Sequence, residues 1–168
     1  MPDEVRLASD AEFSSFYRGT IRELTGFLIN QGAALPVAAD IAQDTMTKAY
    51  RRWTDIRQPR AWVHTVASRA LIRRIADLRE DPVGQLPEPT SLLAVTDPVT
   101  EWETQYDALR LLTVLPPRQR QVLAWTLNGF TPSEIAEHLG LTAEAVRASL
   151  KKARRTAAAH LRNRGELQ

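Results

Sequence analysis

The fold is decided by residues 131–155, whose sequence is TPSEIAEHLGLTAEAVRASLKKARR. Thr131 can cap a helix, Pro132 suits the first helical position, and Glu134 can complete a capping box with Thr131. Ile135 follows as the first inward-facing residue of an apolar pattern with helical spacing. An amphipathic helix is therefore predicted to begin at Pro132.

Three further residues are spaced as in two helices joined by a tight turn. Ala136 is small where two helices must approach closely, Gly140 can supply the turn, and Val146 is apolar six residues later. This spacing is typical of a helix-turn-helix, and a plain helical hairpin is the alternative. The other expected inward positions are Leu139, Leu141 and Leu150. Thr142 is expected to cap the second helix.

The side of the second helix away from Val146 and Leu150 is basic. Side chains of its N-terminal half would reach base edges in the major groove of duplex DNA, and the later basic cluster would meet phosphates. Arg147 is the best candidate for recognising a guanine, because its guanidinium group can donate hydrogen bonds to both acceptors of that base. The predicted DNA contacts are Thr142, Glu144, Arg147, Ala148, Lys151, Lys152, Arg154 and Arg155.

Composition and charge narrow the class of protein. The chain of 168 residues is 43% hydrophobic and 25% charged, as in globular proteins, and has no cysteine for disulfides or thiolate metal sites. Its N-terminus is acidic, and no run of apolar residues is long enough for a membrane span, so we expect a cytoplasmic protein. His64, His138 and His160 are scattered, which favours solvent-facing or packing roles over metal binding.

The net charge of +2 hides strong blocks of charge along the chain. Residues 1–50 carry a net charge of −3 and residues 51–80 carry +5, whereas residues 81–117 carry −5 and residues 118–168 carry +5. Two basic blocks separated by an acidic one favour contact with a polyanion at two places. A solvated charged surface is the alternative.

The N-terminal part of the chain predicts three helices. The first is expected to start in Ser9–Glu12, a possible capping box; the second begins near Pro36 after a turn at Gly32; and the third runs from Pro59 towards Leu78. The apolar positions of the first helix are Phe13, Phe16, Tyr17, Ile21, Leu24, Phe27 and Leu28. Those of the second include Val37, Ile41, Ala49, Tyr50 and Trp53.

An acidic stretch with repeated prolines follows and lacks periodicity, so residues 80–101 are predicted to be a flexible linker. A helix from Trp102 is expected to end before Pro116, and a further helix to end at Asn128–Gly129. We therefore predict an all-α protein of two small domains, residues 1–79 and residues 102–168.

Two polar stripes in the N-terminal domain are candidate binding surfaces. The first, on the second helix, consists of Asp40, Gln43, Asp44, Thr47 and Arg51, and a solvated helix face is its alternative. The second, on the third helix, consists of Trp62, Thr65, Arg69 and Arg73. An aromatic residue with interleaved arginines suits single-stranded nucleic acid, although Trp62 could instead pack in the core.

Two ordered parts of the sequence resemble the extracytoplasmic-function group of bacterial sigma factors, the promoter-recognition subunits of RNA polymerase. One part is DIAQDT at residues 40–45, followed by AYRRW at 49–53 and PRAWV at 59–63. The other is LPPRQRQVL at 115–123, followed by EIAEHLG at 134–140 and Val146–Arg147. This sequence departs from the group at Arg69 and Arg73, where Asn and Asp are common, and at Ala148–Ser149, in place of a common Ser-Arg pair.

The resemblance implies a role for each surface and no cofactor. The first stripe, Asp40, Gln43, Asp44, Thr47 and Arg51, would bind core polymerase. The melted minus-ten strand would be bound by Arg57, Gln58, Arg60, Trp62, Thr65, Arg69 and Arg73. The basic helix after Thr142 would read the minus-35 element of duplex promoter DNA. An anti-sigma protein is the further partner that the resemblance implies.

No enzyme signature competes with this interpretation, because the sequence contains no phosphate-binding glycine loop, nucleophile elbow or metal motif. The expected function is therefore a non-catalytic specificity subunit that recognises a two-part promoter and helps to open it. A stand-alone helix-turn-helix activator or repressor is the main alternative. An RNA-processing or DNA-modifying enzyme is a third, and would need a carboxylate or metal constellation.

Overall fold

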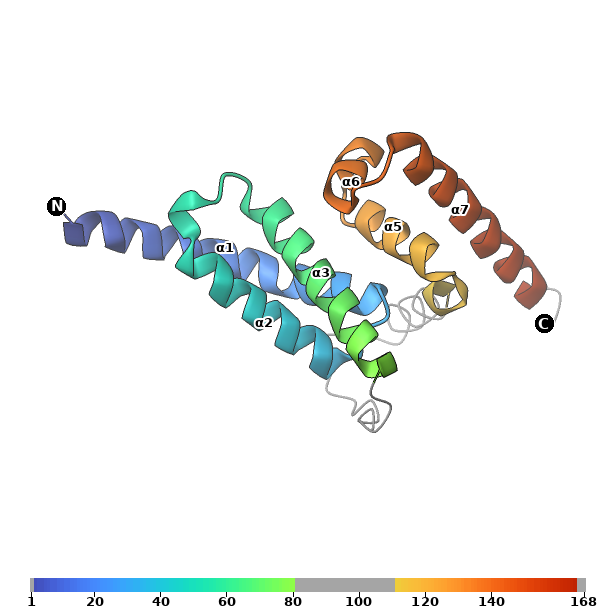
Figure 1. The fold of residues 1–168 in the computed structure, drawn as a ribbon, viewed down its shortest axis with the longest axis horizontal. Helices are drawn as coiled ribbons and strands as arrows, with labels where there is room; N and C mark the ends of the chain where they lie inside the picture. The colour runs from blue at the N-terminus through green and yellow to red at the C-terminus, as the bar shows by residue number, and fades with distance from the viewer. Residues whose placement is uncertain (1, 81–110, 166–168) are drawn as a thin grey trace. The chain divides into compact units, whose positions relative to one another are not determined.

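The computed structural model describes residues 2–80 and 111–165, and the regular structure in these ranges is helical. The labelled elements are α1 (Pro2–Asn30), α2 (Leu35–Arg51), the short 3₁₀ helix η1 (Trp53–Asp55), α3 (Pro59–Glu80), α5 (Pro117–Leu127), α6 (Pro132–Leu139) and α7 (Ala143–Gly165). They form two compact units, an N-terminal lobe of α1 to α3 and a C-terminal lobe of α5 to α7 (Figure 1). The all-α prediction is confirmed. Glu80, the first residue of the predicted linker, belongs to α3, and the rest of the linker lies outside the described residues. So does most of the helix expected from Trp102, although residues 111–114 are helical.

The N-terminal lobe has an apolar core to which all three long helices contribute. Its buried residues include Leu24, Phe27 and Leu28 of α1, Ile41, Met46 and Ala49 of α2, and Val63, Ala67 and Leu71 of α3. Within each helix the spacing of these positions follows the helical period, which places them on one face. Small residues such as Ala38 and Ala42 allow α2 to lie close along α3.

The first helix begins earlier than the sequence suggested. It starts at Pro2, and Ser9–Glu12 lies inside it, so the predicted capping box is not a helix start. Proline suits the first helical position, and Asp3 and Glu4 in the first turn favour the positive end of the helix dipole. Asp10 has a different role, because its carboxylate accepts a hydrogen bond of 2.9 Å from the hydroxyl of Tyr50.

An aromatic cluster ties α1 to the end of α2. The ring of Phe13 lies 5.0 Å from that of Tyr50 and 5.2 Å from that of Trp53, and Phe16 lies 5.1 Å from Trp53. Trp53 belongs to η1 and not to the predicted second helix. The cluster therefore fixes the point at which the chain leaves α2 and turns towards α3.

The C-terminal lobe is built around Trp125, which is fully buried on α5. Its ring meets Phe130 edge-on at 4.8 Å and stacks on His138 of α6 at 5.4 Å. His138 therefore has the packing role that its isolation in the sequence favoured. The helix α5 ends at Leu127 before the predicted Asn128–Gly129 turn, where Gly129 has a φ of 84°.

Candidate nucleic-acid interface

The helix-turn-helix begins with the predicted capping box at the start of α6. The backbone N–H of Glu134 donates to the hydroxyl of Thr131 at 3.3 Å, and the N–H of Thr131 donates to the carboxylate of Glu134 at 2.7 Å. Pro132 occupies the first turn of the helix. Both orphan N–H groups are thus satisfied locally, which fixes where α6 starts.

The turn between α6 and α7 depends on Gly140. Its φ of 65° lies in the left-handed region, where a side chain is disfavoured, and the next residue, Leu141, donates its N–H to Ala136 at 2.9 Å. Thr142 then caps α7 by accepting a hydrogen bond of 3.1 Å from the N–H of Ala145. These local contacts set the direction in which α7 leaves the turn.

The helix α7 is divided between an apolar face and a basic one. Val146, Leu150 and Ala153 are buried against α5 and α6. The eight predicted DNA contacts, Thr142, Glu144, Arg147, Ala148, Lys151, Lys152, Arg154 and Arg155, are all exposed. The helix can therefore enter a DNA groove without losing any of its core contacts.

The predicted stripe of α3 also lies away from the core. Val63, His64, Ala67, Ser68 and Leu71 form the buried face of this helix. On its other side Trp62 and Thr65 are half-buried, and Arg69 and Arg73 are exposed. Because Trp62 is half-buried, part of its side chain is available to solvent, as a stacking platform requires.

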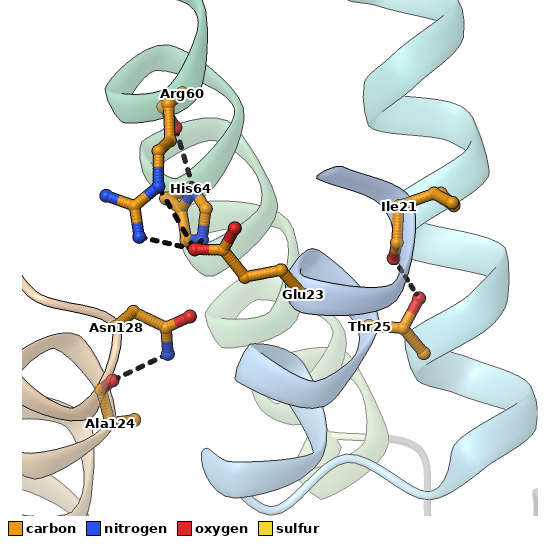
Figure 2. Close-up of polar contacts among 7 residues, drawn as sticks. All are labelled: Ile21, Glu23, Thr25, Arg60, His64, Ala124 and Asn128. Carbon is orange, nitrogen blue, oxygen red and sulfur yellow. Dashed lines mark hydrogen bonds and ion pairs between the residues drawn. The ribbon is translucent and has the colours of Figure 1, made fainter. Parts of the chain in front are cut away.

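The segment entering α3 contains further predicted contacts. Arg57 and Gln58 are exposed in the loop before the helix. Arg60 is also exposed, but its guanidinium is paired with Glu23 of α1: Nε donates to the carboxylate at 3.0 Å and Nη2 donates to the same oxygen (Figure 2). The structure thus places Arg60 at the junction of α1 and α3.

All five residues of the predicted stripe on α2 are exposed, namely Asp40, Gln43, Asp44, Thr47 and Arg51. The side chains at its two edges contact the flanking helices. Asp40 pairs with Arg74 of α3 at 3.3 Å, and the amide of Gln43 donates to the Tyr17 hydroxyl at 2.6 Å. Asp44 pairs along its own helix with Lys48 at 2.8 Å.

The sequence-based prediction missed Glu23, Arg74 and Tyr17, all of which hold predicted site residues. The i, i+4 spacing of Glu23 with Phe27 and of Arg60 with His64 was a usable signal, because such pairs share a helix face. It did not reveal that the two faces meet. Within residues 2–80 and 111–165, no group of three or more His, Cys, Asp or Glu side chains could hold a metal ion. In the same ranges no helix has the length and apolar character that crossing a membrane requires.

Comparison with known proteins identifies both lobes. Residues 16–80 match the family model "Sigma-70 region 2", and residues 106–156 match "Sigma-70, region 4". A curated relative, the ECF RNA polymerase sigma factor SigJ of Mycobacterium tuberculosis, is 37% identical over 134 residues, which are 70% of this chain and 42% of that protein. The chain therefore spans less than half the length of this relative.

Solved structures share the fold. The sigma factor RpoE of Bartonella quintana, in complex with the anti-sigma factor NepR, matches with a TM-score of 0.73 and 17% identity, covering 90% of this chain and 97% of that one. CnrH, in complex with the cytosolic domain of CnrY, matches with a TM-score of 0.65 and 19% identity, covering 92% and 90%. With regions 2 and 4 both present and in order, the chain belongs to the extracytoplasmic-function group of the sigma-70 family, a family of non-catalytic RNA polymerase subunits.

Proposed function

We propose that this chain is an alternative sigma factor that binds core RNA polymerase, recognises minus-35 and minus-ten promoter elements and promotes DNA opening. The observation that carries the proposal is the exposed basic face of α7, which is the second helix of the helix-turn-helix and belongs to the region 4 match. The region 2 match precedes it in the same chain. The protein has no catalytic role of its own in this proposal and works in the cytoplasm, where the polymerase transcribes.

The minus-35 surface consists of the eight exposed residues of α7 and its cap. Arg147 lies close to the N-terminal end of the helix, from which a side chain reaches base edges, and Lys151, Lys152, Arg154 and Arg155 follow as phosphate contacts. Glu144 can accept a hydrogen bond from the amino group of a cytosine. Specificity and non-specific affinity thus come from different parts of one helix.

The strand-binding surface is our name for the seven residues proposed to bind the melted minus-ten strand, which are Arg57, Gln58, Arg60, Trp62, Thr65, Arg69 and Arg73. Unstacking a base from the duplex costs a few kcal/mol. Stacking on Trp62 and neutralisation of phosphates by Arg69 and Arg73 would offset that cost. Arg69 and Arg73 stand where Asn and Asp are common in the group. This surface is therefore more basic than the corresponding surface of such proteins.

The stripe on α2 is the proposed contact with core polymerase. Asp40 and Asp44 are 70% and 63% exposed despite their ion pairs, so a partner surface with basic residues can still reach their carboxylates. Exposed ion pairs of this kind contribute little to the stability of the free protein. Asp40 and Asp44 can therefore leave their ion pairs with Arg74 and Lys48 and pair with basic residues of a partner at little cost in stability.

An anti-sigma protein is the second proposed partner. Two structures of similar fold are complexes, one of the sigma factor RpoE with the anti-sigma factor NepR and one of CnrH with the cytosolic domain of CnrY. Such a partner would inhibit this chain by covering the surfaces proposed for polymerase or DNA.

The function is tested by adding the purified chain to sigma-free core polymerase together with a library of promoter sequences. We expect a stable complex and initiation from a subset of the library that shares two sequence elements. Initiation that does not depend on the added chain would contradict the proposal. Binding to duplex DNA without binding to core polymerase would instead support a stand-alone regulator.

A matched pair of variants tests the polymerase contact in the same assay. Asp40→Ala combined with Asp44→Ala should weaken core binding, whereas Glu12→Gln, at an exposed position of α1 outside the stripe, should not. Equal core affinity of the two variants would contradict the role of the α2 stripe.

A further inference from the structure

Two helices of the N-terminal lobe meet through four residues that form two i, i+4 pairs. Glu23 and Phe27 lie on one face of α1, and Arg60 and His64 lie on one face of α3. Figure 2 shows the Glu23 side chain pointing toward Arg60 and His64. One oxygen of the Glu23 carboxylate accepts both hydrogen bonds from Arg60, and Nε2 of His64 lies 3.7 Å from the same oxygen. The contact is thus concentrated on a single carboxylate.

The inner half of this contact is buried. His64 is fully buried, its Nδ1 donates to the backbone carbonyl of Arg60 at 2.7 Å, and its ring meets that of Phe27 edge-on at 4.7 Å. Phe27 is itself 1% exposed in the centre of the lobe. The first two turns of α3 therefore contact α1 in two ways. Arg60 makes a polar contact with Glu23, and the His64 ring packs on Phe27 beneath it.

The same two turns carry part of the strand-binding surface. Trp62 and Thr65 lie between and just after the residues that contact α1 and face away from the core. The two N–H groups of Arg60 that converge on the Glu23 carboxylate add a directional, charge-assisted contact to the apolar packing of α3 on α1. A rotation of α3 about its axis would turn the ring of Trp62 away from a base.

Glu23 is a negatively charged residue beside a surface that is proposed to bind DNA. Residues 51–80, which contain the strand-binding surface, carry a net charge of +5, and a nearby carboxylate opposes binding of a polyanion. Electrostatics alone would favour a neutral residue at this position if the surface binds DNA. A carboxylate at this position is explained if its role is structural and not a direct interaction with the DNA.

We propose that Glu23 is a positioning residue for the strand-binding surface: through Arg60 and His64 it holds the first two turns of α3 in the orientation that presents Trp62 and Thr65 to a single strand. This inference rests on the proposed function of that surface. It assigns to Arg60 a role in orienting the helix in addition to any contact with DNA.

The experiment measures binding of the full chain to short, fluorescently labelled single-stranded DNA of random sequence by anisotropy. Glu23→Gln keeps the size of the side chain and removes its charge. We expect it to weaken binding by about tenfold, the loss of roughly one stacked base, although it makes the protein more positive. Glu23→Asp, which keeps the carboxylate, should recover part of this loss, and Glu12→Gln on the same helix should not weaken binding.

Three results would overturn the proposal. Equal or tighter binding by Glu23→Gln would mean that the carboxylate only opposes DNA or competes with it for Arg60. Faster hydrogen exchange throughout α2 in the same variant would mean general unfolding of the N-terminal lobe and not a change in the orientation of α3. An absence of single-strand binding by the unaltered chain would overturn the proposed strand-binding function together with this inference.

A double-mutant cycle separates positioning from general destabilisation. If Glu23 acts by orienting Trp62, the losses caused by Glu23→Gln and Trp62→Ala should overlap, so that the double variant binds about as weakly as Trp62→Ala alone. Arg73→Ala, two helical turns beyond Thr65, should multiply the loss caused by Glu23→Gln. Independent effects in the Trp62 cycle would contradict the proposal.

Discussion

At the scale of single residues, exposure alone does not distinguish base readers from phosphate contacts on α7. Arg147 and Lys152 are both exposed and both cationic, and they differ in position along the helix and in geometry. The fork of an arginine matches the two acceptors of guanine, whereas a lysine ammonium acts as a point charge. Substitution should therefore have different consequences at the two positions.

We predict that Arg147→Ala costs roughly 1–3 kcal/mol of binding free energy at one base position of the minus-35 element and relaxes preference there. Lys152→Ala should weaken binding to all sequences by a similar factor and reduce the salt dependence of binding. Selection from a duplex library, followed by anisotropy on single-base variants, measures both effects. A uniform loss for Arg147→Ala would make it a phosphate contact.

A second residue-scale prediction concerns Tyr50, whose pKa is raised above its ordinary value, first by the hydrogen bond to Asp10 and then by the negative charge of that carboxylate. Because the pKa in the folded state exceeds that of the unfolded chain, the contact stabilises the fold below the unfolded pKa. That contribution is lost as the pH rises through the folded pKa.

Asp10→Asn should lower the pKa of Tyr50, because it removes the charged acceptor. Titration of tyrosinate absorbance in this variant and in the unaltered chain measures the change, with Tyr50→Phe identifying the Tyr50 component. An unchanged midpoint would show that the hydrogen bond does not persist in solution.

At the scale of elements, local chemistry explains which boundaries could be predicted. The start of α6 and the turn at Gly140 followed from neighbouring residues, because a capping box and a left-handed glycine act within a few positions. The start of α1 did not, because the residues at Ser9–Glu12 suit a cap equally well when a helix passes through them. The placement of Trp53 outside α2 depends on aromatic contacts with α1, which local sequence does not contain.

The candidate surfaces divide in the same way. The exposed face of α7 and the stripe on α3 could be predicted, because burial of Val146 or Val63 dictates which side of a helix faces solvent. The pairing of Glu23 with Arg60 joins positions 37 residues apart and could not be inferred from periodicity. Contacts between helices therefore account for most of what the sequence did not reveal.

The turn at Gly140 supports an element-scale prediction with a matched control. Gly140→Ala should destabilise the C-terminal lobe by about 1–2 kcal/mol, because alanine is strained in the left-handed region even where its Cβ meets nothing. Gly19→Ala, at an exposed position within α1 where the Cβ also has open space, should stabilise its lobe by roughly 0.5–1 kcal/mol. Urea unfolding measures both values, and a neutral Gly140→Ala would contradict the conformation of the turn.

At the scale of the whole molecule, each lobe has a core of its own. The buried residues of α1, α2 and α3 form one, and those of α5, α6 and α7 form the other. A reader of two separated promoter elements benefits from such independence, because each lobe can keep its own binding geometry. The prediction that follows concerns cooperativity of unfolding.

Met46→Ala should lower the stability of the N-terminal lobe by about 2–5 kcal/mol, since Met46 is 1% exposed and its loss leaves a cavity. Hydrogen exchange of the full chain should then become faster in α2 and α3 and stay unchanged in α7. Val146→Ala, at a fully buried position of α7, should produce the reverse pattern. Faster exchange throughout both lobes after either substitution would show that the chain unfolds as one cooperative unit, and the two proposed DNA-binding surfaces would then be coupled through stability.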